Sequence, residues 1–215
     1  MPLLVVVVTS AEDLASALRM RRLPDFFELR LDALWDALPL VEMAKEKLRA
    51  PLIVTARHPA EGGLHDLSSM ERRDVLLRFL PGAAFVDIEL RGTAELKPVL
   101  ATAGRRGINR IISFHDAGRT PSVRELAELA HLAAAVKADV FKVATRTDRE
   151  EDVARLLEFL ELECGKIPIS AMGLGKLGRS ARRQLVQRGS ALNYAPLGNA
   201  RIEGQLSLRE MRLAI

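Results

Sequence analysis

The sequence predicts an α/β protein built as one (β/α)8 barrel, a TIM barrel, in a single domain of residues 1–215. Short β-branched runs alternate with segments of helical periodicity, which is typical of a parallel sheet with helices outside it. Eight repeats in 215 residues leave about 27 residues per unit, close to the minimum for a strand, a helix and their loops. An open doubly wound sheet is the alternative, because a strand count from sequence can be wrong by one or two.

Eight runs are candidate strands, because each is short, mostly apolar and bounded by polar or turn residues. Helical spacing of apolar residues separates them, most clearly in Glu125–Lys137 and Asp148–Glu161. Functional side chains of such a barrel are expected at the carboxyl ends of its strands. In chain order the candidate strands are Leu3–Val8, Phe26–Leu31, Leu52–Ala56, Ala84–Leu90, Arg110–Phe114, Asp139–Ala144, Ile167–Ala171 and Ala191–Ala195.

Composition excludes several classes of protein. With 48% hydrophobic and 28% charged residues, the chain can bury a sizeable core, which excludes a disordered chain. The apolar run Leu3–Val8 is too short to span a membrane and lacks the flanks of a signal peptide. The single cysteine, Cys164, excludes an internal disulfide and is too few for a structural zinc site. We therefore expect a cytoplasmic protein with no membrane partner and no metal.

The charge pattern favours a small anionic ligand over nucleic acid. The net charge is only +4, and 4% of the residues are aromatic. The densest basic stretch, Arg179–Arg188, contains no aromatic side chain on which a base could stack. A few arginines directed into one site would bind an anionic small molecule equally well.

Polar residues occur inside or directly after several predicted strands. Glu28 and Arg30 lie on one face of the second strand, with Asp32 following on the same side. Charged groups inside a barrel must pair with each other or bind a polar ligand. Arg57 ends the third strand, and Glu61 follows it in a Glu-Gly-Gly loop.

The fourth and fifth strands add further polar candidates. Asp87 and Glu89 share one face of the fourth strand, and His115 lies at the carboxyl end of the fifth. A histidine in that position is suited to proton transfer, because its ordinary pKa of about 6.5 lies near neutral pH.

Lys142 is the strongest single signal. It is one of seven lysines and lies within a strand, where Val140 and Ala144 share its face toward the barrel interior and Phe141 and Val143 face the helices. A lysine in that position loses hydration, so we expect a chemical role for its amine, although a structural ion pair with Asp87 or Glu89 is the alternative. Burial and neighbouring cations favour the neutral amine that attacks a carbonyl group.

The segment Gly173–Gly178 spells Gly-x-Gly-x-x-Gly between a strand and a helix, which is the fingerprint of dinucleotide binding. Too little chain follows it for a dinucleotide-binding sheet, and the residue about 20 positions on is Asn193 rather than an acid. After a seventh barrel strand, the glycines more simply allow backbone N–H groups or Arg182 to approach an anion.

Together these residues indicate imine chemistry on an anionic carbonyl compound, with proton transfer at the neighbouring carbon. Spacing leaves both a dehydratase and an aldolase open. A ligand-binding barrel without catalysis is a further alternative.

The order of the segments resembles the type I 3-dehydroquinate dehydratase family, Schiff-base enzymes of the shikimate pathway and so of aromatic amino-acid biosynthesis. The similarity runs from about Glu28 to Gln205 and includes the segments around Arg57, His115, Lys142 and Arg182. It implies that Lys142 forms an iminium with the C3 ketone of 3-dehydroquinate and that His115 moves the C2 proton. It further implies that Glu61 orients His115, and that substrate is bound by Glu28, Arg30, Arg57, Arg182 and Gln205.

The resemblance also implies a hydro-lyase that needs no cofactor, and a homodimer is expected for such a barrel. Two departures stand out. Where the family usually reads Ser-Ala-Pro-Gly-Gln, the chain has Arg201-Ile202-Glu203-Gly204-Gln205. The first predicted strand, Leu3–Val8, has no serine to match the one that some family members use, although Thr9 and Ser10 follow it directly.

Overall fold

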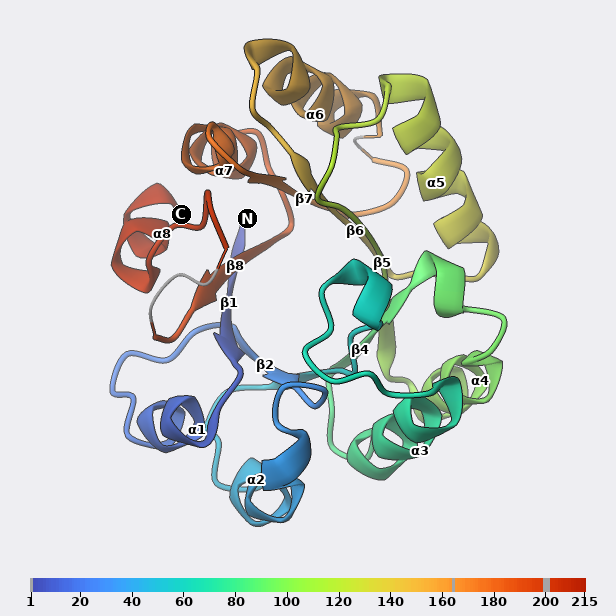
Figure 1. The fold of residues 1–215 in the computed structure, drawn as a ribbon, viewed down its shortest axis with the longest axis vertical. Coiled ribbons are helices and arrows are strands. Elements are labelled where there is room, and N and C mark those ends of the chain that lie inside the picture. Colours follow the sequence, from blue (N-terminus) through green and yellow to red (C-terminus); the bar gives the residue numbers. More distant parts are fainter. Residues whose placement is uncertain (1, 164, 199–201) are drawn as a thin grey trace.

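The computed structural model describes residues 2–163, 165–198 and 202–215, and in it eight parallel strands form one sheet that curves into a barrel. Figure 1 looks down this barrel and shows the eight α-helices arranged around the outside of the strands. The order β7-β6-β5-β4-β3-β2-β1-β8 pairs strands β1 to β7 with their neighbours in the chain and brings β8 against β1. The predicted (β/α)8 barrel is therefore confirmed, and the open doubly wound sheet is wrong.

The strands of the structure coincide with the predicted runs to within two or three residues at each end. They are β1 (Leu3–Val8), β2 (Phe26–Arg30), β3 (Leu52–Thr55), β4 (Phe85–Glu89), β5 (Asn109–Asp116), β6 (Val140–Arg146), β7 (Ile169–Leu174) and β8 (Leu192–Pro196).

One α-helix follows each strand. The helices are α1 (Ala11–Leu18), α2 (Leu38–Lys45), α3 (Ser69–Phe79), α4 (Lys97–Arg106), α5 (Val123–Ala135), α6 (Glu150–Leu162), α7 (Gly178–Gln187) and α8 (Leu208–Ala214). Local sequence sets where α3, α5 and α8 begin, because each starts with a serine whose side chain and a glutamate three residues later cap one another.

Alternation along each strand separates two apolar cores. One lies between the strands and the helices and includes Phe141 and Val143. The other fills the barrel interior, where the rings of Phe26 and Phe85 meet edge to face. Its buried members are Val5, Ile53, Ile111, Val140, Ala144, Met172, Leu192 and Tyr194. Lys142 thus points into the barrel, as its place in the strand pattern predicts.

The barrel is least regular between β7 and β8. Within the described residues these strands share no continuous ladder of backbone hydrogen bonds. Ala191 N–H donates to the carbonyl of Ile169 at 2.8 Å, and the hydroxyl of Ser190 accepts from Ala171 N–H at 3.0 Å. Serine side chains therefore complete part of this junction. Across the residues that the structure describes, no helix has the length and apolar character needed to cross a membrane.

Candidate active site

A cavity of about 350 Å³ lies at the carboxyl ends of the strands. It contains the polar positions that the strand pattern singled out, brought together from β2, β5, β6 and the segments after β3, β7 and β8. All eight residues predicted for the site line it: Glu28, Arg30, Arg57, Glu61, His115, Lys142, Arg182 and Gln205.

Lys142 lies at the floor of this cavity, with only 5% of its surface exposed. Its Nζ atom is 2.9 Å from Oδ2 of Asp87 and 3.4 Å from Oε1 of Glu28. The structural ion pair considered for Lys142 therefore exists, and its acidic partner is Asp87. The same amine borders an open cavity, which a purely structural pair does not require.

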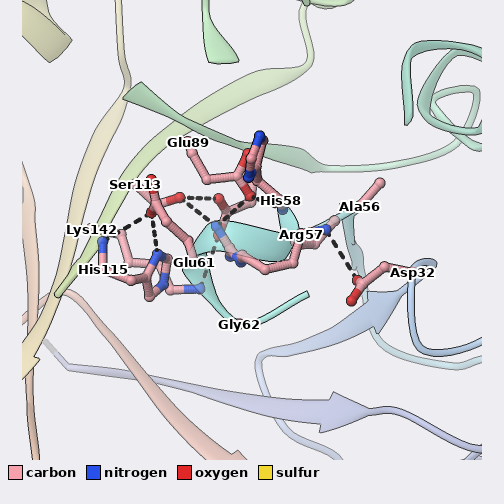
Figure 2. A network of polar contacts seen from close by, with 12 residues as sticks. Asp32, Ala56, Arg57, His58, Glu61, Gly62, Glu89, Ser113, His115 and Lys142 are labelled. Carbon is pink, nitrogen blue, oxygen red and sulfur yellow. Dashed lines mark hydrogen bonds and ion pairs between the residues drawn. The ribbon is translucent and has the colours of Figure 1, made fainter. Parts of the chain in front are cut away.

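Arg57 connects Lys142 to the rest of the site. Its guanidinium donates to Asp87 at 2.9 Å, to Ser113 at 2.7 Å and to Glu89 at 3.0 Å. Figure 2 shows this side chain extending away from Asp32 toward Lys142 and Ser113. Arg57 and Lys142 share Oδ2 of Asp87, and both cations hold the pKa of that carboxyl well below its usual range despite the opposing effect of burial.

The acidic and basic residues of β2 do not pair with each other. Glu28 accepts a hydrogen bond from Thr55 at 2.8 Å, whereas Arg30 forms a two-point ion pair with Asp32. Arg30 also donates to the carbonyl of Gly62 at 3.0 Å. Arg30 therefore ties the Glu-Gly-Gly loop to the end of β2 while it borders the cavity.

Glu61 reaches His115 because the loop turns back sharply after β3. Gly62 adopts φ +88°, and a Cβ on Gly63 would collide with the carbonyl oxygen of Arg57, so both positions favour glycine. Oε2 of Glu61 then accepts from the backbone N–H of His115 at 3.0 Å and lies 2.9 Å from its Nδ1.

The surroundings shift the pKa values of Glu61 and His115 in opposite directions. Burial, reinforced by the charge of Glu89, raises the pKa of Glu61 to about 7. Burial, with Arg57 and Lys142 nearby, lowers the pKa of His115 well below its ordinary value. His115 is thus neutral near pH 7. With Glu61 ionised, a proton on Nδ1 leaves Nε2 free to accept one.

Arg182 is a buried cation that has no acidic partner in the described part of the chain. Its Nε donates to the carbonyl of Gly173 at 3.0 Å and its Nη1 to the carbonyl of Tyr194 at 3.3 Å. No described carboxylate lies within ion-pair distance of it, and burial lowers the pKa of its guanidinium to about 10. A buried guanidinium that lines a cavity and has no acidic partner among the described residues is suited to bind an anionic ligand group.

The segment Gly173–Gly178 serves packing rather than dinucleotide binding in this structure. Its backbone meets the loop after β8: Gly175 N–H donates to the carbonyl of Glu203 at 3.0 Å. A Cβ on Gly178 would lie 2.8 Å from the Cα of Gly204. Through this contact the loop after β8 places Ile202 and Gln205 at the cavity. Glu203 of the same loop also forms an ion pair with Arg146 at 3.4 Å. Arg201 lies outside the described residues, as does Cys164.

The residues after β1 do not replace the missing serine. The hydroxyl of Thr9 donates to Asp13 at 2.8 Å, and Ser10 caps the start of α1. Neither residue lines the cavity. Among the described residues, no cluster of three or more His, Cys, Asp or Glu side chains could hold a metal ion.

Sequence reasoning missed Tyr194 and Met172, which line the cavity from β8 and β7. Tyr194 carried a signal that could have been used, because the only tyrosine of the chain alternates with Leu192 on the inward face of a strand. Met172 carried none, since an apolar side chain in a strand predicts core.

The fold and the cavity define the class: a (β/α)8-barrel protein that holds a buried lysine, a neutral histidine and a guanidinium without an acidic partner among the described residues at one open cavity. Comparison with known proteins identifies the particular group. The sequence profile of the family "Type I 3-dehydroquinase" matches residues 3–215, and the chain belongs to this family.

Similar proteins agree with this membership. The 3-dehydroquinate dehydratase of Methanocella arvoryzae is 32% identical over 211 residues, which cover 98% of this chain and 94% of that protein. Among solved structures, 3-dehydroquinate dehydratase from Geobacillus kaustophilus superposes with a TM-score of 0.89 and 26% identity, covering 100% of this chain and 90% of that one. The enzyme from Enterococcus faecalis has a TM-score of 0.84 at 27% identity, with 99% and 92% covered.

Proposed function

We propose that this chain dehydrates 3-dehydroquinate to 3-dehydroshikimate through an imine on Lys142, as a hydro-lyase of aromatic biosynthesis. Family membership supports the reaction. The observation that carries the residue assignment is that the buried amine of Lys142 and the neutral ring of His115 border the same cavity from neighbouring strands. Ser113 is in register with Lys142, so His115 lies two residues nearer the open end of the barrel.

Imine formation begins when Lys142 releases one proton and its neutral amine attacks the C3 ketone. The carbinolamine hydroxyl takes up that proton and leaves as water, so the nitrogen carries the positive charge of the iminium. Asp87 stays paired when Lys142 loses its charge, because the Oδ2 atom of Asp87 keeps its ion pair with Arg57. The iminium restores a positive charge on the same nitrogen, beside Asp87 and Glu28. These carboxylates therefore stabilise the cation without moving.

The iminium then serves as the electron sink. His115 takes a proton from C2 through Nε2, and the C–H electrons move to the imine nitrogen to give an enamine. As they return, the C1 hydroxyl leaves with a proton from His115, forming the C1–C2 double bond. Hydrolysis of the imine releases product, so the net change is loss of one water. Glu61 holds the ring of His115 in one orientation throughout.

Charge complementarity supports the binding of a carboxylate at Arg182 and of ring hydroxyls by Glu28, Arg30, Arg57 and Gln205. Arg182 has no acidic partner among the described side chains, and a substrate carboxylate would supply one. The expected homodimer, the cytoplasmic location and the absence of a nucleic-acid partner stay predictions. They rest on the sequence alone.

The decisive experiment is to mix the protein with 3-dehydroquinate, reduce with borohydride and map the modified peptide by mass. Lys142→Met is the test variant, and Lys166→Met, at a half-exposed lysine paired with Glu163, is the control. We expect an adduct on Lys142 in the parent and in the control only. Absorbance of the conjugated enone then reports turnover. An adduct without enone would indicate a ligand-binding barrel, and no adduct from folded protein would exclude the imine.

A further inference from the structure

Arg72 is a buried arginine that the proposed reaction does not use. It belongs to α3, outside the strands, yet only 1% of its surface is exposed. It is the largest of the fully buried side chains in the described part of the molecule. Burying a guanidinium costs hydration, so such a residue is retained only where its contacts repay that cost.

The side-chain hydrogen bonds of Arg72 go to the end of β3 and to Glu89 at the end of β4, while its Nη1 atom is buried without a hydrogen-bond partner among the described residues. Its Nε donates to the carbonyl of Ala56 at 2.8 Å, and its Nη2 pairs with Oε2 of Glu89. The other oxygen of Glu89 accepts from Arg57 Nη1 at 3.0 Å and from the backbone N–H of His58 at 2.9 Å. Directly and through Glu89, Arg72 thus holds three consecutive residues, 56 to 58.

These three residues support both reacting groups. Arg57 shares Asp87 with Lys142. The chain after residue 58 forms the turn that carries Glu61 to His115. Figure 2 shows Ala56, Arg57 and His58 between Asp32 on one side and the Lys142–His115 group on the other. A shift of this segment would therefore displace Arg57, which shares Asp87 with the amine, together with Glu61, the partner of the imidazole.

Arg72 also sets the charge next to Glu89. The carboxylate of Glu89 is balanced by Arg57 and Arg72 together. Without Arg72, Glu89 would draw more strongly on Arg57, which must also hold Asp87 and Ser113. Loss of Arg72 would leave the buried carboxylate of Glu89 with one guanidinium partner in place of two, which favours movement of Arg57 toward Glu89.

We propose that Arg72 is a positioning residue for the reaction at Lys142 and His115, acting through Glu89 and the segment 56–58 without touching substrate. This inference rests on the proposed function. It predicts a larger loss in the chemical steps than in binding, because Arg72 acts on the segment that carries Arg57 and leads to Glu61, whereas Arg30 and Arg182 reach the cavity without contacting Arg72.

The test compares Arg72→Met, Arg72→Lys and the control Arg78→Met. Arg78 belongs to the same helix and pairs with Glu42, but on the exposed surface. Activity is expressed per molecule that borohydride can trap on Lys142, and thermal unfolding is followed by circular dichroism. We expect Arg72→Met to lower kcat about 100-fold with a clearly smaller change in KM, since small displacements near reacting groups have effects of this size on rate. Arg72→Lys should recover part of the loss, and Arg78→Met should behave as the parent.

Two outcomes separate the proposals. If the parent protein neither traps substrate nor forms enone, the proposed function fails. If the parent is active and folded Arg72→Met has the parent's kcat, Arg72 is only structural. Should Arg72→Met not fold, Arg72→Lys decides: a lowered kcat at a parent-like melting temperature supports positioning, and a parent-like kcat overturns it.

Discussion

The Nζ atom of Lys142 lies 3.9 Å from the centroid of the Tyr194 ring. A cation over a desolvated aromatic face gains about 2 kcal/mol. The charge sits on this nitrogen both in the ammonium and in the iminium, so the ring stabilises either state. The hydroxyl of Tyr194, in contrast, is buried with no hydrogen-bond partner among the described residues.

Tyr194→Leu and Tyr194→Phe should therefore differ. We expect Tyr194→Leu to leave borohydride trapping at Lys142 within about threefold of the parent, because the ammonium and the iminium lose the same aromatic contact, and to destabilise the fold by about 2 kcal/mol, because the buried cation loses that contact. Tyr194→Phe keeps the face and removes an unsatisfied hydroxyl, which should stabilise the fold by about 1 kcal/mol, or 2–4 °C in melting temperature. Trapping rates and thermal unfolding measure both effects. Slow trapping in the Leu variant would show that the ring favours the iminium over the ammonium, and slow trapping in the Phe variant would assign a chemical role to the hydroxyl.

The pKa of Glu61, raised to about 7, predicts the acid side of the pH profile. Ionised Glu61 accepts the Nδ1 proton of His115 and leaves Nε2 basic, so kcat/KM should fall as the pH drops through about 7. Glu61→Gln should be slower at every pH and should lack this titration. Glu128→Gln, at an exposed position on α5, is the matched control. An unchanged acid limb in the Gln variant would assign the titration to another group.

The raised pKa of Glu61 also predicts how the free energy of unfolding depends on pH. Between the ordinary carboxyl pKa of 4.5 and about 7, folded Glu61 holds a proton that the unfolded chain has released. The folded state then binds more protons, so this group lowers stability as the pH rises across that range. Relative to the parent, Glu61→Gln should gain stability from pH 5 to pH 8. Chemical denaturation at the two pH values measures the gain, and a constant difference would contradict it.

Arg182 should contribute to binding more than to the chemical steps. Losing a charge-assisted hydrogen bond costs about 1.5–3 kcal/mol, so Arg182→Met should raise KM about 10- to 100-fold. Arg183→Met, on the exposed face of α7, should leave KM unchanged. An analogue without the carboxylate should bind the parent and the Arg182 variant equally. A preference of that analogue for the parent would place the carboxylate elsewhere.

The glycine-rich turn predicts a steric test of the loop after β8. Gly178→Ala would place a Cβ 2.8 Å from the Cα of Gly204, so the loop after β8 should move and displace Ile202 and Gln205 from the cavity. We expect a higher KM, measured with steady-state kinetics. Gly104→Ala in α4 meets only an ordinary contact at 3.5 Å and should be neutral or slightly stabilising. Parent-like kinetics in Gly178→Ala would mean that the contact with Gly204 is not needed.

Much of this protein follows from sequence alone, because local patterns specify it. Alternation along short strands determined the barrel and the inward direction of Lys142, and the rule that sites lie at strand ends located Arg57 and His115. The Gly-Gly pair after Glu61 marked a turn, since positive φ angles favour glycine.

Only the tertiary structure decided which charges pair. Sequence left Glu28 and Arg30 as a possible pair, but Arg30 binds Asp32 and Glu28 lies beside Lys142. It was equally silent on Arg72, which a helical pattern would place on the surface, and on the contact between Gly178 and Gly204. The physical reason is that periodicity is a local property, which shows the face of a strand or helix on which a residue lies. Ion pairs and close packing instead depend on the distances between elements that are far apart in the sequence and meet only in the folded barrel.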